Sequence, residues 1–186
     1  MNSPNPSVFL LPGWQNSGPG HWQTEWEQRL GHVRVEQHDW LHPLRGDWTA
    51  RLDDVLADSG APVLLAAHSL GCILTAWWAA HSRHAHKVRG ALLVAPGDVE
   101  QPGLAAQIPG WTPIARQRLP FPAVLVASRN DPYCSFERAR QLAADWGARL
   151  VDGGDCGHIN AESGLGDWPQ GQALLRQLAD GAGRQG

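Results

Sequence analysis

The sequence predicts an α/β fold in which a six-stranded, mostly parallel sheet lies between two layers of helices. The first observation is that apolar segments of strand length alternate with segments of helix length six times along the chain. The second is that several strand-like segments are unbroken runs of Val, Leu and Ala, which is typical of parallel strands covered on both faces. The third is that no linker or repeat interrupts the alternation, so we expect one domain over residues 1–186.

The first two elements are marked by a turn signal and by a helical spacing. Residues 7–13, SVFLLPG, are apolar until a Pro-Gly pair ends the strand. Residues 20–31 carry Trp22, Trp26 and Leu30 four positions apart, so these side chains share one face of a helix. We therefore expect a strand over 7–13 and a helix over 20–31.

Four further elements continue the alternation. Residues 33–40 alternate as a strand does, although their tail is polar. Residues 47–60 place their apolar side chains on one helix face and end on a glycine. Residues 62–68 have the length and composition of a fully buried strand, and residues 70–84 indicate a helix. Ser69 alone separates this strand from this helix.

The last part of the chain begins with two buried strands that are far apart in sequence. The Pro- and Gly-rich residues 97–121 lie between them, and a segment of this length can form a flap with one short helix but not a separate lid domain. The expected strands are 90–96, 122–128 and 148–153, and the expected helices are 135–147 and 167–181.

Composition and charge exclude several classes of function. Apolar residues make up 42% of the chain and charged residues 18%, as in globular proteins. The net charge of −3 gives no basic face, so we expect neither a nucleic-acid partner nor an anionic membrane. No apolar run approaches the roughly 20 residues of a membrane helix, and residues 1–13 lack the features of a signal peptide. A cytoplasmic protein is therefore expected.

Three residues with complementary chemistry each follow an expected strand. They are Ser69, Asp131 and His158, in that chain order. Because folds of this class bind ligands beyond the carboxyl ends of their strands, we expect the three side chains to meet at one edge of the sheet. This is the chain order of nucleophile, acid and base in α/β hydrolases. It predicts Ser69 as nucleophile, His158 as general base and acid, and Asp131 as the group that orients the imidazole, with no metal or cofactor.

The pentapeptide AHSLG predicts a nucleophile elbow around Ser69. A serine hydroxyl needs an adjacent base, and a sharp strand-to-helix turn lifts it to where an imidazole can reach it. The turn also aims the N–H of Leu70 at a developing oxyanion. The usual pattern is G-x-S-x-G, and here Ala67 replaces the first glycine. The second donor is expected from the loop after the first strand, where the N–H of Trp14 is the first candidate and that of Gln15 the alternative.

Several other titratable side chains have simpler interpretations. His68 either lines the pocket or packs under the turn, and Asp152 and Asp155 are rival acids whose chain position is wrong for orienting His158. Two histidine groups resemble metal sites but are not expected to bind metal; they are His81, His84 and His86, and His38, Asp39 and His42.

The cysteines show no C-x-x-C spacing and are expected to be free thiols: Cys72, Cys134 and Cys156. Cys156 stands two residues before His158, where it is either a small loop residue or a redox influence on the site.

Five segments resemble the small serine hydrolases of the retinoblastoma-binding-protein-9/YdeN family: LLPGWQNSGPGHWQTEWE, QHDWLHPLRGDW, AAHSLGC, SRNDPYC and GGDCGHINAESGLGDWPQG. The likeness extends over about residues 7–180. It implies a minimal α/β-hydrolase fold without a large cap, a triad of Ser69, Asp131 and His158, and weak esterase or peptidase-like activity. The L-x-C-x-E motif behind the mammalian member's retinoblastoma binding does not occur in this sequence, so that role is not expected.

We therefore expect a cofactor-free serine hydrolase that cleaves small acyl esters through an acyl-enzyme intermediate. Two alternatives stay open. One is an amidase or aminopeptidase-like hydrolase, and the other is a binding protein that keeps the fold with an idle triad. Since 97–121 is too short for a lid domain, the pocket is expected to be open and shallow, with Trp14 and Trp111 either as aromatic walls or as structural residues.

Overall fold

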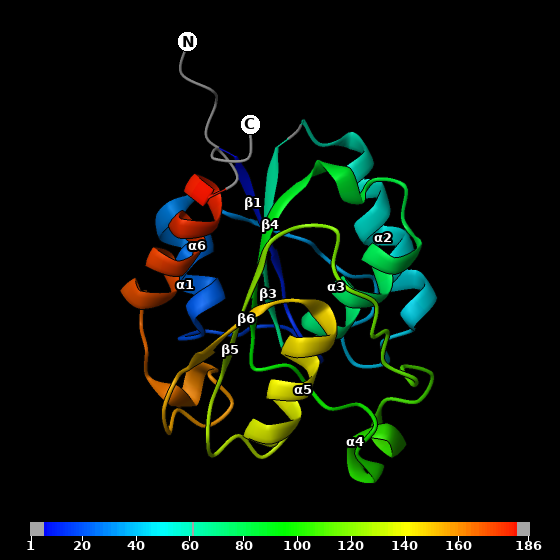
Figure 1. The fold of residues 1–186 in the computed structure, drawn as a ribbon, viewed down its shortest axis with the longest axis vertical. Helices are drawn as coiled ribbons and strands as arrows, with labels where there is room; N and C mark the ends of the chain where they lie inside the picture. Colours follow the sequence, from blue (N-terminus) through cyan, green and yellow to red (C-terminus); the bar gives the residue numbers. More distant parts are fainter. Residues whose placement is uncertain (1–5, 61, 182–186) are drawn as a thin grey trace.

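The computed structural model describes residues 6–60 and 62–181 and contains a six-stranded sheet between two layers of helices (Figure 1). Both ends of the expected domain, residues 1–5 and 182–186, lie outside the described residues, as does residue 61. All neighbouring strands pair in parallel, which confirms the predicted fold class. In spatial order the strands are β2 (Val33–Arg34), β1 (Ser7–Leu11), β3 (Val63–His68), β4 (Val88–Val94), β5 (Ala123–Ala127) and β6 (Arg149–Asp152).

The helices divide between the two faces of the sheet (Figure 1). One face is covered by α1 (Trp22–Leu30) and α6 (Pro169–Gly181). The other is covered by α2 (Arg45–Asp58), α3 (Leu70–His81) and α5 (Phe136–Trp146). Three shorter helices complete the fold: η1 (Ala85–Lys87), α4 (Pro102–Gln107) and η2 (Ala161–Ser163). Among the described helices none has the length and apolar character needed to cross a membrane.

Successive side chains of each strand point to opposite faces of the sheet and pack in two separate core layers. In β3, Leu65 and Ala67 pack in the layer with α2, α3 and α5. Leu64 and Ala66 pack in the layer with α1 and α6. Because helices cover both faces of the sheet, nearly every position of a central strand is buried and favours an apolar residue. This explains the unbroken Val, Leu and Ala runs.

The strand order reverses between β1 and β3. The chain passes from β1 to α1 on one face and from β3 to α3 on the other, so the two connections leave the sheet in opposite directions. Such a reversal opens a crevice at the carboxyl ends of the strands. A cavity at this edge is lined by Trp14 from the loop after β1 and by Ser69 and Leu70 after β3.

The strand expected over 33–40 is wrong in its length, because β2 contains only Val33 and Arg34. The N–H of Val35 still donates to the carbonyl of Leu10 at 2.9 Å, and then the chain leaves the sheet. It turns at Asp39, whose carboxylate accepts from the N–H groups of two following residues at 2.8 Å each. A carboxylate that binds its neighbouring backbone competes with strand pairing, which accounts for the polar tail.

The helix expected over 70–84 ends at His81. The next residue, Ser82, has an extended backbone, and its hydroxyl accepts from the N–H of His84 at 3.0 Å and binds Asp53. A serine that bonds locally in this way favours a helix end. The flap between β4 and β5 contains one six-residue helix, α4, as expected for a chain without a large cap.

Candidate active site

Ser69 occupies a strained turn between β3 and α3, with φ 54° and ψ −117°. Its N–H donates to the carbonyl of Val94 at 3.0 Å, which ties the turn to the neighbouring strand. Glycines make the turn possible. A Cβ at Gly71 would lie 2.2 Å from the carbonyl oxygen of Leu11, and a Cβ at Gly13 would lie 2.8 Å from the Cβ of Ser69. The loop after β1 therefore packs directly against the elbow.

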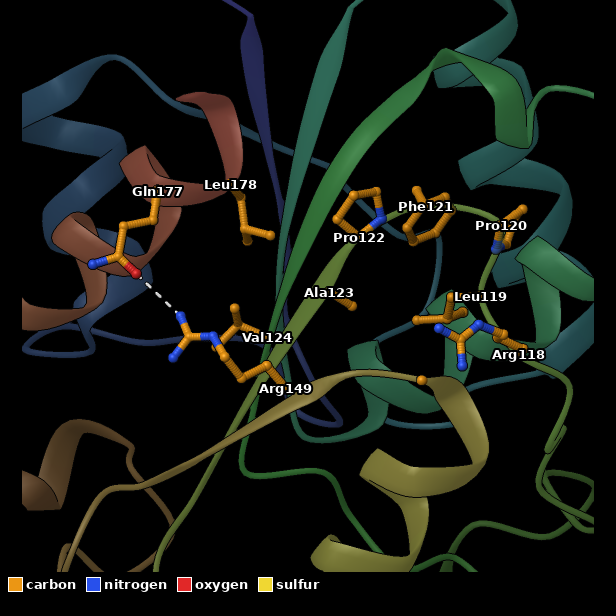
Figure 2. A pocket seen from close by; sticks show the side chains of 11 residues that line it. Arg118, Leu119, Pro120, Phe121, Pro122, Ala123, Val124, Arg149, Gln177 and Leu178 are labelled. Atoms are coloured by element: carbon orange, nitrogen blue, oxygen red, sulfur yellow. Dashed lines mark hydrogen bonds between the residues drawn. The ribbon is translucent and has the colours of Figure 1, made fainter. Parts of the chain in front are cut away.

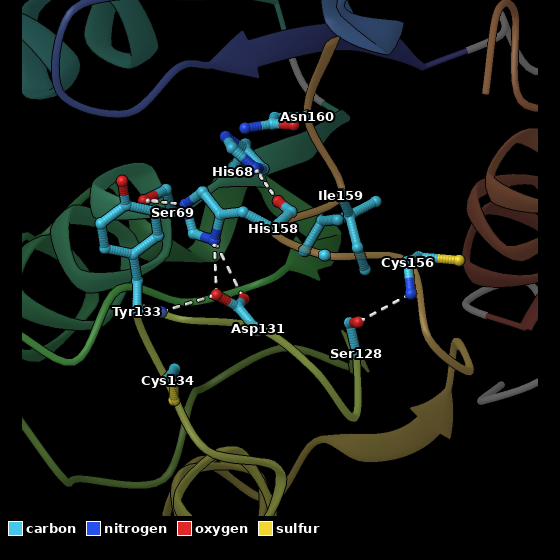
Figure 3. Close-up of polar contacts among 12 residues, drawn as sticks. His68, Ser69, Ser128, Asp131, Tyr133, Cys134, Cys156, His158, Ile159 and Asn160 are labelled. Carbon is cyan, nitrogen blue, oxygen red and sulfur yellow. Dashed lines mark hydrogen bonds and ion pairs between the residues drawn. The ribbon is translucent and has the colours of Figure 1, made fainter. Parts of the chain in front are cut away.

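The structure brings the three side chains predicted from the sequence into one hydrogen-bonded chain (Figure 3). His158 Nε2 lies 2.9 Å from Ser69 Oγ. His158 Nδ1 lies 2.9 and 3.0 Å from the two carboxylate oxygens of Asp131. Since a carboxylate only accepts, Nδ1 carries the proton and Nε2 is free to accept from the hydroxyl of Ser69.

The carboxylate of Asp131 is shielded from solvent and held in place. Its side chain is 2% exposed and that of His158 is 10% exposed. The N–H of Tyr133 donates to Asp131 Oδ1 at 2.9 Å. The rival Asp152 binds Arg129 and the N–H of Gly154 instead, so it is not the carboxylate that contacts His158.

Two polar residues that sequence reasoning missed join the loop of the acid to the loop of the base. Ser128 Oγ accepts from the N–H of Cys156 at 2.9 Å and donates to Asn130 Oδ1 at 2.9 Å. Asn130 Oδ1 also accepts from the N–H of Gly157 at 2.7 Å. The only signal in the sequence is their place beside Asp131, because the contacts span more than twenty residues. The N–H of Cys156 is thus part of this junction, and its Sγ lies 3.1 Å from the carbonyl oxygen of Gly153.

Trp14 and Leu70, the two residues expected to supply oxyanion donors, line the same cavity as Ser69. The N–H groups of Trp14 and Leu70 have no hydrogen-bond acceptor within residues 6–60 and 62–181, whereas that of Gln15 donates to the carbonyl of Trp40 at 3.0 Å. Trp14 is therefore the better donor of the two candidates. Gly97, also missed from the sequence, keeps this space open, since a Cβ there would lie 3.3 Å from Ser69 Oγ.

The rings of His68 and His21 meet edge to face, with centroids 4.6 Å apart, and both residues border the cavity. His68 lines the cavity, as the first interpretation has it, and its Nε2 lies 2.8 Å from the carbonyl oxygen of His158 rather than under the turn at Ser69. Burial, followed by the neighbouring His21 and His158, lowers the pKa of His68 well below its ordinary value. Burial, with Arg34 and His158, lowers the pKa of His21 to about 3. Both rings are therefore neutral near pH 7.

The cavity in front of Ser69 has a volume of about 460 Å³. Apolar side chains of the flap form one wall: Val99, Leu104 and Ile108. Trp14 borders the cavity, but Trp111 does not. Trp111 is fully buried and donates its Nε1–H to the carbonyl of Pro43 at 2.9 Å, so its structural interpretation is the right one.

A larger cavity of about 670 Å³ lies at the opposite end of β5, around Pro122, Ala123 and Val124 (Figure 2). None of the predicted site residues lines it. Its charged groups, Arg118 and Arg149, come from the connection before β5 and from β6, and Arg149 binds Gln177 at 3.0 Å. The chemistry expected from the sequence is thus associated with the smaller cavity.

The histidines of the two groups that resemble metal sites do not converge on one point. His81 and His86 each contact a nearby carbonyl at 2.8 Å, and His84 pairs with Asp53 at 3.2 Å. Asp39 pairs with His42 at 3.3 Å. In the described part of the chain no three His, Cys, Asp or Glu side chains are grouped to hold a metal ion. The three cysteines are free, and burial raises the pKa of Cys72 and raises that of Cys134 to about 12.

Comparison with known proteins identifies relatives of this sequence and fold. The serine hydrolase family profile matches residues 8–177. A YdeN-like hydrolase from Pectobacterium atrosepticum is 32% identical, with a TM-score of 0.83 over 95% of this chain and 91% of the other. Among curated proteins there is no match.

More distant structures share the fold. The ydeN gene product from B. subtilis is 21% identical with a TM-score of 0.77, over 94% of this chain and 99% of the other. The Bacillus cereus carboxylesterase is 15% identical with a TM-score of 0.61, over 97% and 90%. The family match covers most of the sequence, and the chain is therefore a member of the serine hydrolase family, an enzyme built on the α/β-hydrolase fold.

Proposed function

We propose that Ser69, His158 and Asp131 are the catalytic triad of this hydrolase and that the N–H groups of Trp14 and Leu70 form its oxyanion hole. The observation that carries the proposal is the chain of hydrogen bonds from Asp131 through His158 to Ser69, which ends in the cavity that Trp14 and Leu70 also line. Nucleophile, base, orienting acid and oxyanion donors are the parts that acyl transfer requires.

The reaction follows from these positions. His158 Nε2 takes the proton of Ser69 as Oγ attacks the acyl carbon, and the carbonyl oxygen becomes an anion held by the two N–H groups. The imidazolium, stabilised by Asp131, then gives its proton to the leaving alcohol or amine. Water repeats the sequence on the acyl-enzyme and releases the acid. Each oxyanion donor accounts for about a 100- to 1000-fold effect on the rate.

The shape and charge of the cavity favour small acyl esters. A volume of about 460 Å³ lies at the lower end of the range for small-molecule sites. Within the described residues, the lining includes no Lys or Arg and one carboxylate, that of Glu162. A site with this charge disfavours anionic substrates. We infer that neutral substrates with short acyl chains are preferred.

Glu162 also favours a second candidate function. A carboxylate at the edge of an acyl-transfer site can pair with the α-amino group of an aminoacyl ester or amide. The aminopeptidase-like alternative therefore has a specific residue to support it. Glu162 is exposed, so the pairing would be worth little unless the bound substrate excludes water from it.

The test is hydrolysis of p-nitrophenyl acetate, butyrate and palmitate and of aminoacyl arylamides by the wild type and by Ser69→Ala. We expect the wild type to hydrolyse the short esters fastest, because the cavity is small and the flap short. We expect Ser69→Ala to lower kcat by a factor on the order of 10⁴ or more. Circular dichroism and urea unfolding check that the variant is folded. Undiminished turnover by folded Ser69→Ala would exclude Ser69, and an inactive wild type would favour the idle triad.

A further inference from the structure

We propose that His68 is a positioning residue for the general base and that it acts with His21 and Trp22, at the start of α1. His68 and Trp22 bind the main-chain carbonyls of His158 and Ile159, and His21 contacts the ring of His68; we call these three side chains the clasp. The inference rests on the proposed function, since it concerns how the proposed base is held. It adds a role for a side chain that neighbours the nucleophile in sequence yet contacts the base.

The segment that the clasp holds is strained. Ile159, directly after His158, has φ 46°, a left-handed conformation that a β-branched residue rarely adopts. Such a conformation persists only where the surroundings fix it. The carbonyls of both residues are bound by side chains. His68 Nε2 lies 2.8 Å from the carbonyl oxygen of His158, and Trp22 Nε1 donates to that of Ile159 at 3.1 Å (Figure 3 shows the former).

The groups that His68 and His21 contact determine which of their ring nitrogens carry hydrogen. A carbonyl oxygen only accepts, so His68 Nε2 carries hydrogen and His68 Nδ1 is an acceptor in the neutral ring. His21 Nε2, 3.4 Å from that atom, is therefore the donor. His21 Nδ1 is then an acceptor, and the N–H of Gln23 donates to it at 3.1 Å. One arrangement of hydrogens satisfies every member of the chain, which fixes the orientation of His68.

The neutral state of His68 and His21 matters because the ring of His68 lies beside that of the proposed base, His158. The ring centroids of His68 and His158 are 4.8 Å apart, and His158 becomes an imidazolium during the proposed reaction. A positive charge on His68 would oppose that step. Burial keeps the pKa values of His68 and His21 far below neutrality. The clasp therefore supplies hydrogen bonds to the main chain without adding a charge behind the base.

Removing the clasp is expected to affect chemistry more than binding. Without the bond from His68, Ile159 can relax, and His158 Nε2 moves from its position 2.9 Å from Ser69 Oγ. The cavity wall formed by the flap does not depend on this bond, and at His68 itself the variant replaces one neutral lining side chain with another. A misplacement of about 1 Å in a catalytic group costs about 100-fold in rate. We therefore expect kcat to fall and KM to change little.

The test compares His68→Leu, which removes the donor, with His68→Gln, whose Nε2 keeps a donor near the same place. With p-nitrophenyl acetate, kcat of His68→Leu should fall about 10- to 100-fold with KM within about threefold, and His68→Gln should recover most of kcat. His84→Leu, which removes a histidine far from the site, is the matched control and should leave kcat unchanged. If His68→Leu does not fold, Trp22→Phe removes the second donor instead. Its kcat should also fall, by a smaller factor, with KM little changed.

A second measurement does not depend on activity. Deuterium exchange of the backbone N–H groups at 156–160 should speed up in His68→Leu and not in His68→Gln or His84→Leu. This separates the two proposals, since an inactive wild type would contradict the triad but leave the exchange readable. Unchanged exchange and unchanged kcat in folded His68→Leu, or a His68→Gln variant no better than His68→Leu, would overturn the clasp.

Discussion

Ser69 has a side chain and yet adopts a positive φ of 54°, so its neighbours must both permit and hold that conformation. They permit it by having no Cβ. The backbone of Gly71 lies so close to β1 that an added Cβ would be 2.2 Å from the carbonyl oxygen of Leu11. They hold it through the hydrogen bond between the N–H of Ser69 and the carbonyl of Val94. The hydroxyl is therefore exposed to His158 by a backbone that cannot easily relax.

We predict that Gly71→Ala destabilises the protein, because backbone atoms of β1 and of the elbow would have to move apart. We expect the free energy of unfolding to fall by about 1–3 kcal/mol, the usual cost of overpacking a core. Gly103→Ala is the control. A Cβ at Gly103 in α4 meets no atom within 4 Å, so this change should be neutral or should stabilise by a few tenths of a kcal/mol. Urea unfolding measures both, and equal stabilities for the two variants would contradict the close approach at Gly71.

At the residue scale the sequence could predict the reactive groups but not their supports. Ser69, Asp131 and His158 could be predicted because each follows a strand, and parallel strands end at one edge. Ser128 and Gly97 could not, because their roles depend on which loops face each other. Trp111 shows the same limit, since an aromatic residue near the flap can line a cavity or, as here, pack in the core.

At the scale of elements, the loop after β1 is fastened to two strands. The side chain of Arg34, in β2, is 6% exposed and donates to the carbonyl of Ser17 at 2.9 Å and to Asn16 Oδ1. Gln23 accepts from the hydroxyl of Ser17 at 2.6 Å and donates to the carbonyl of Ala66, in β3, at 2.9 Å. This loop supplies the proposed donor Trp14. Its fixed position is what makes a backbone N–H useful in catalysis.

We predict that Arg34→Met lowers kcat for short p-nitrophenyl esters by about 10- to 100-fold, because the loop that carries Trp14 loses the hydrogen bonds from Arg34 to Asn16 and Ser17. Arg29→Met is the control, since Arg29 forms an exposed ion pair with Glu25 and its side chain is 62% exposed. That variant should keep the wild-type kcat. Steady-state kinetics on both variants, with unfolding curves to confirm folding, gives the answer. An Arg34→Met variant as active as Arg29→Met would show that the loop needs no such anchor.

Element types were easier to predict than element ends. The apolar runs and helical spacings of the sequence identify the strands and long helices, because burial on two faces leaves a strong pattern. The ends depend on local side-chain bonds that compete with the backbone. Asp39 turns the chain soon after β2, and Ser82 ends α3 three residues before the predicted end. Such bonds are common to many Asp and Ser residues, so their position alone does not predict them.

At the scale of the whole molecule, two buried apolar layers enclose the sheet, and the proposed site lies at the carboxyl ends of its strands. Titratable groups buried in this edge link stability to pH. In the unfolded chain, His21 binds a proton near pH 6.5, whereas in the folded protein its pKa is about 3. Between these values the unfolded state holds more protons than the native state, so the free energy of unfolding falls as pH falls from 6.5 toward 3. His68 acts in the same direction.

We predict that stability is full above pH 6.5 and decreases below it, with each of these histidines contributing up to about 1.4 kcal/mol per pH unit. Urea unfolding at pH 7, 6 and 5 measures the slope. His21→Gln should reduce the slope, because it removes one titrating group. His38→Gln is the control and should leave the slope unchanged, since His38 is exposed and makes no hydrogen bond or ion pair with the residues that the structure describes. A slope that His21→Gln does not alter would contradict the burial of a neutral His21.

The most direct test of the convergence of Ser69, Asp131 and His158 is covalent labelling with a fluorophosphonate, which reacts with an activated serine and loses fluoride. Intact-mass analysis should show one adduct on the wild type, and peptide mapping should locate it on Ser69. His158→Ala, which keeps the hydroxyl but removes its base, should label far more slowly. A wild type without an adduct, or with one only on a cysteine, would contradict the claim that His158 activates Ser69.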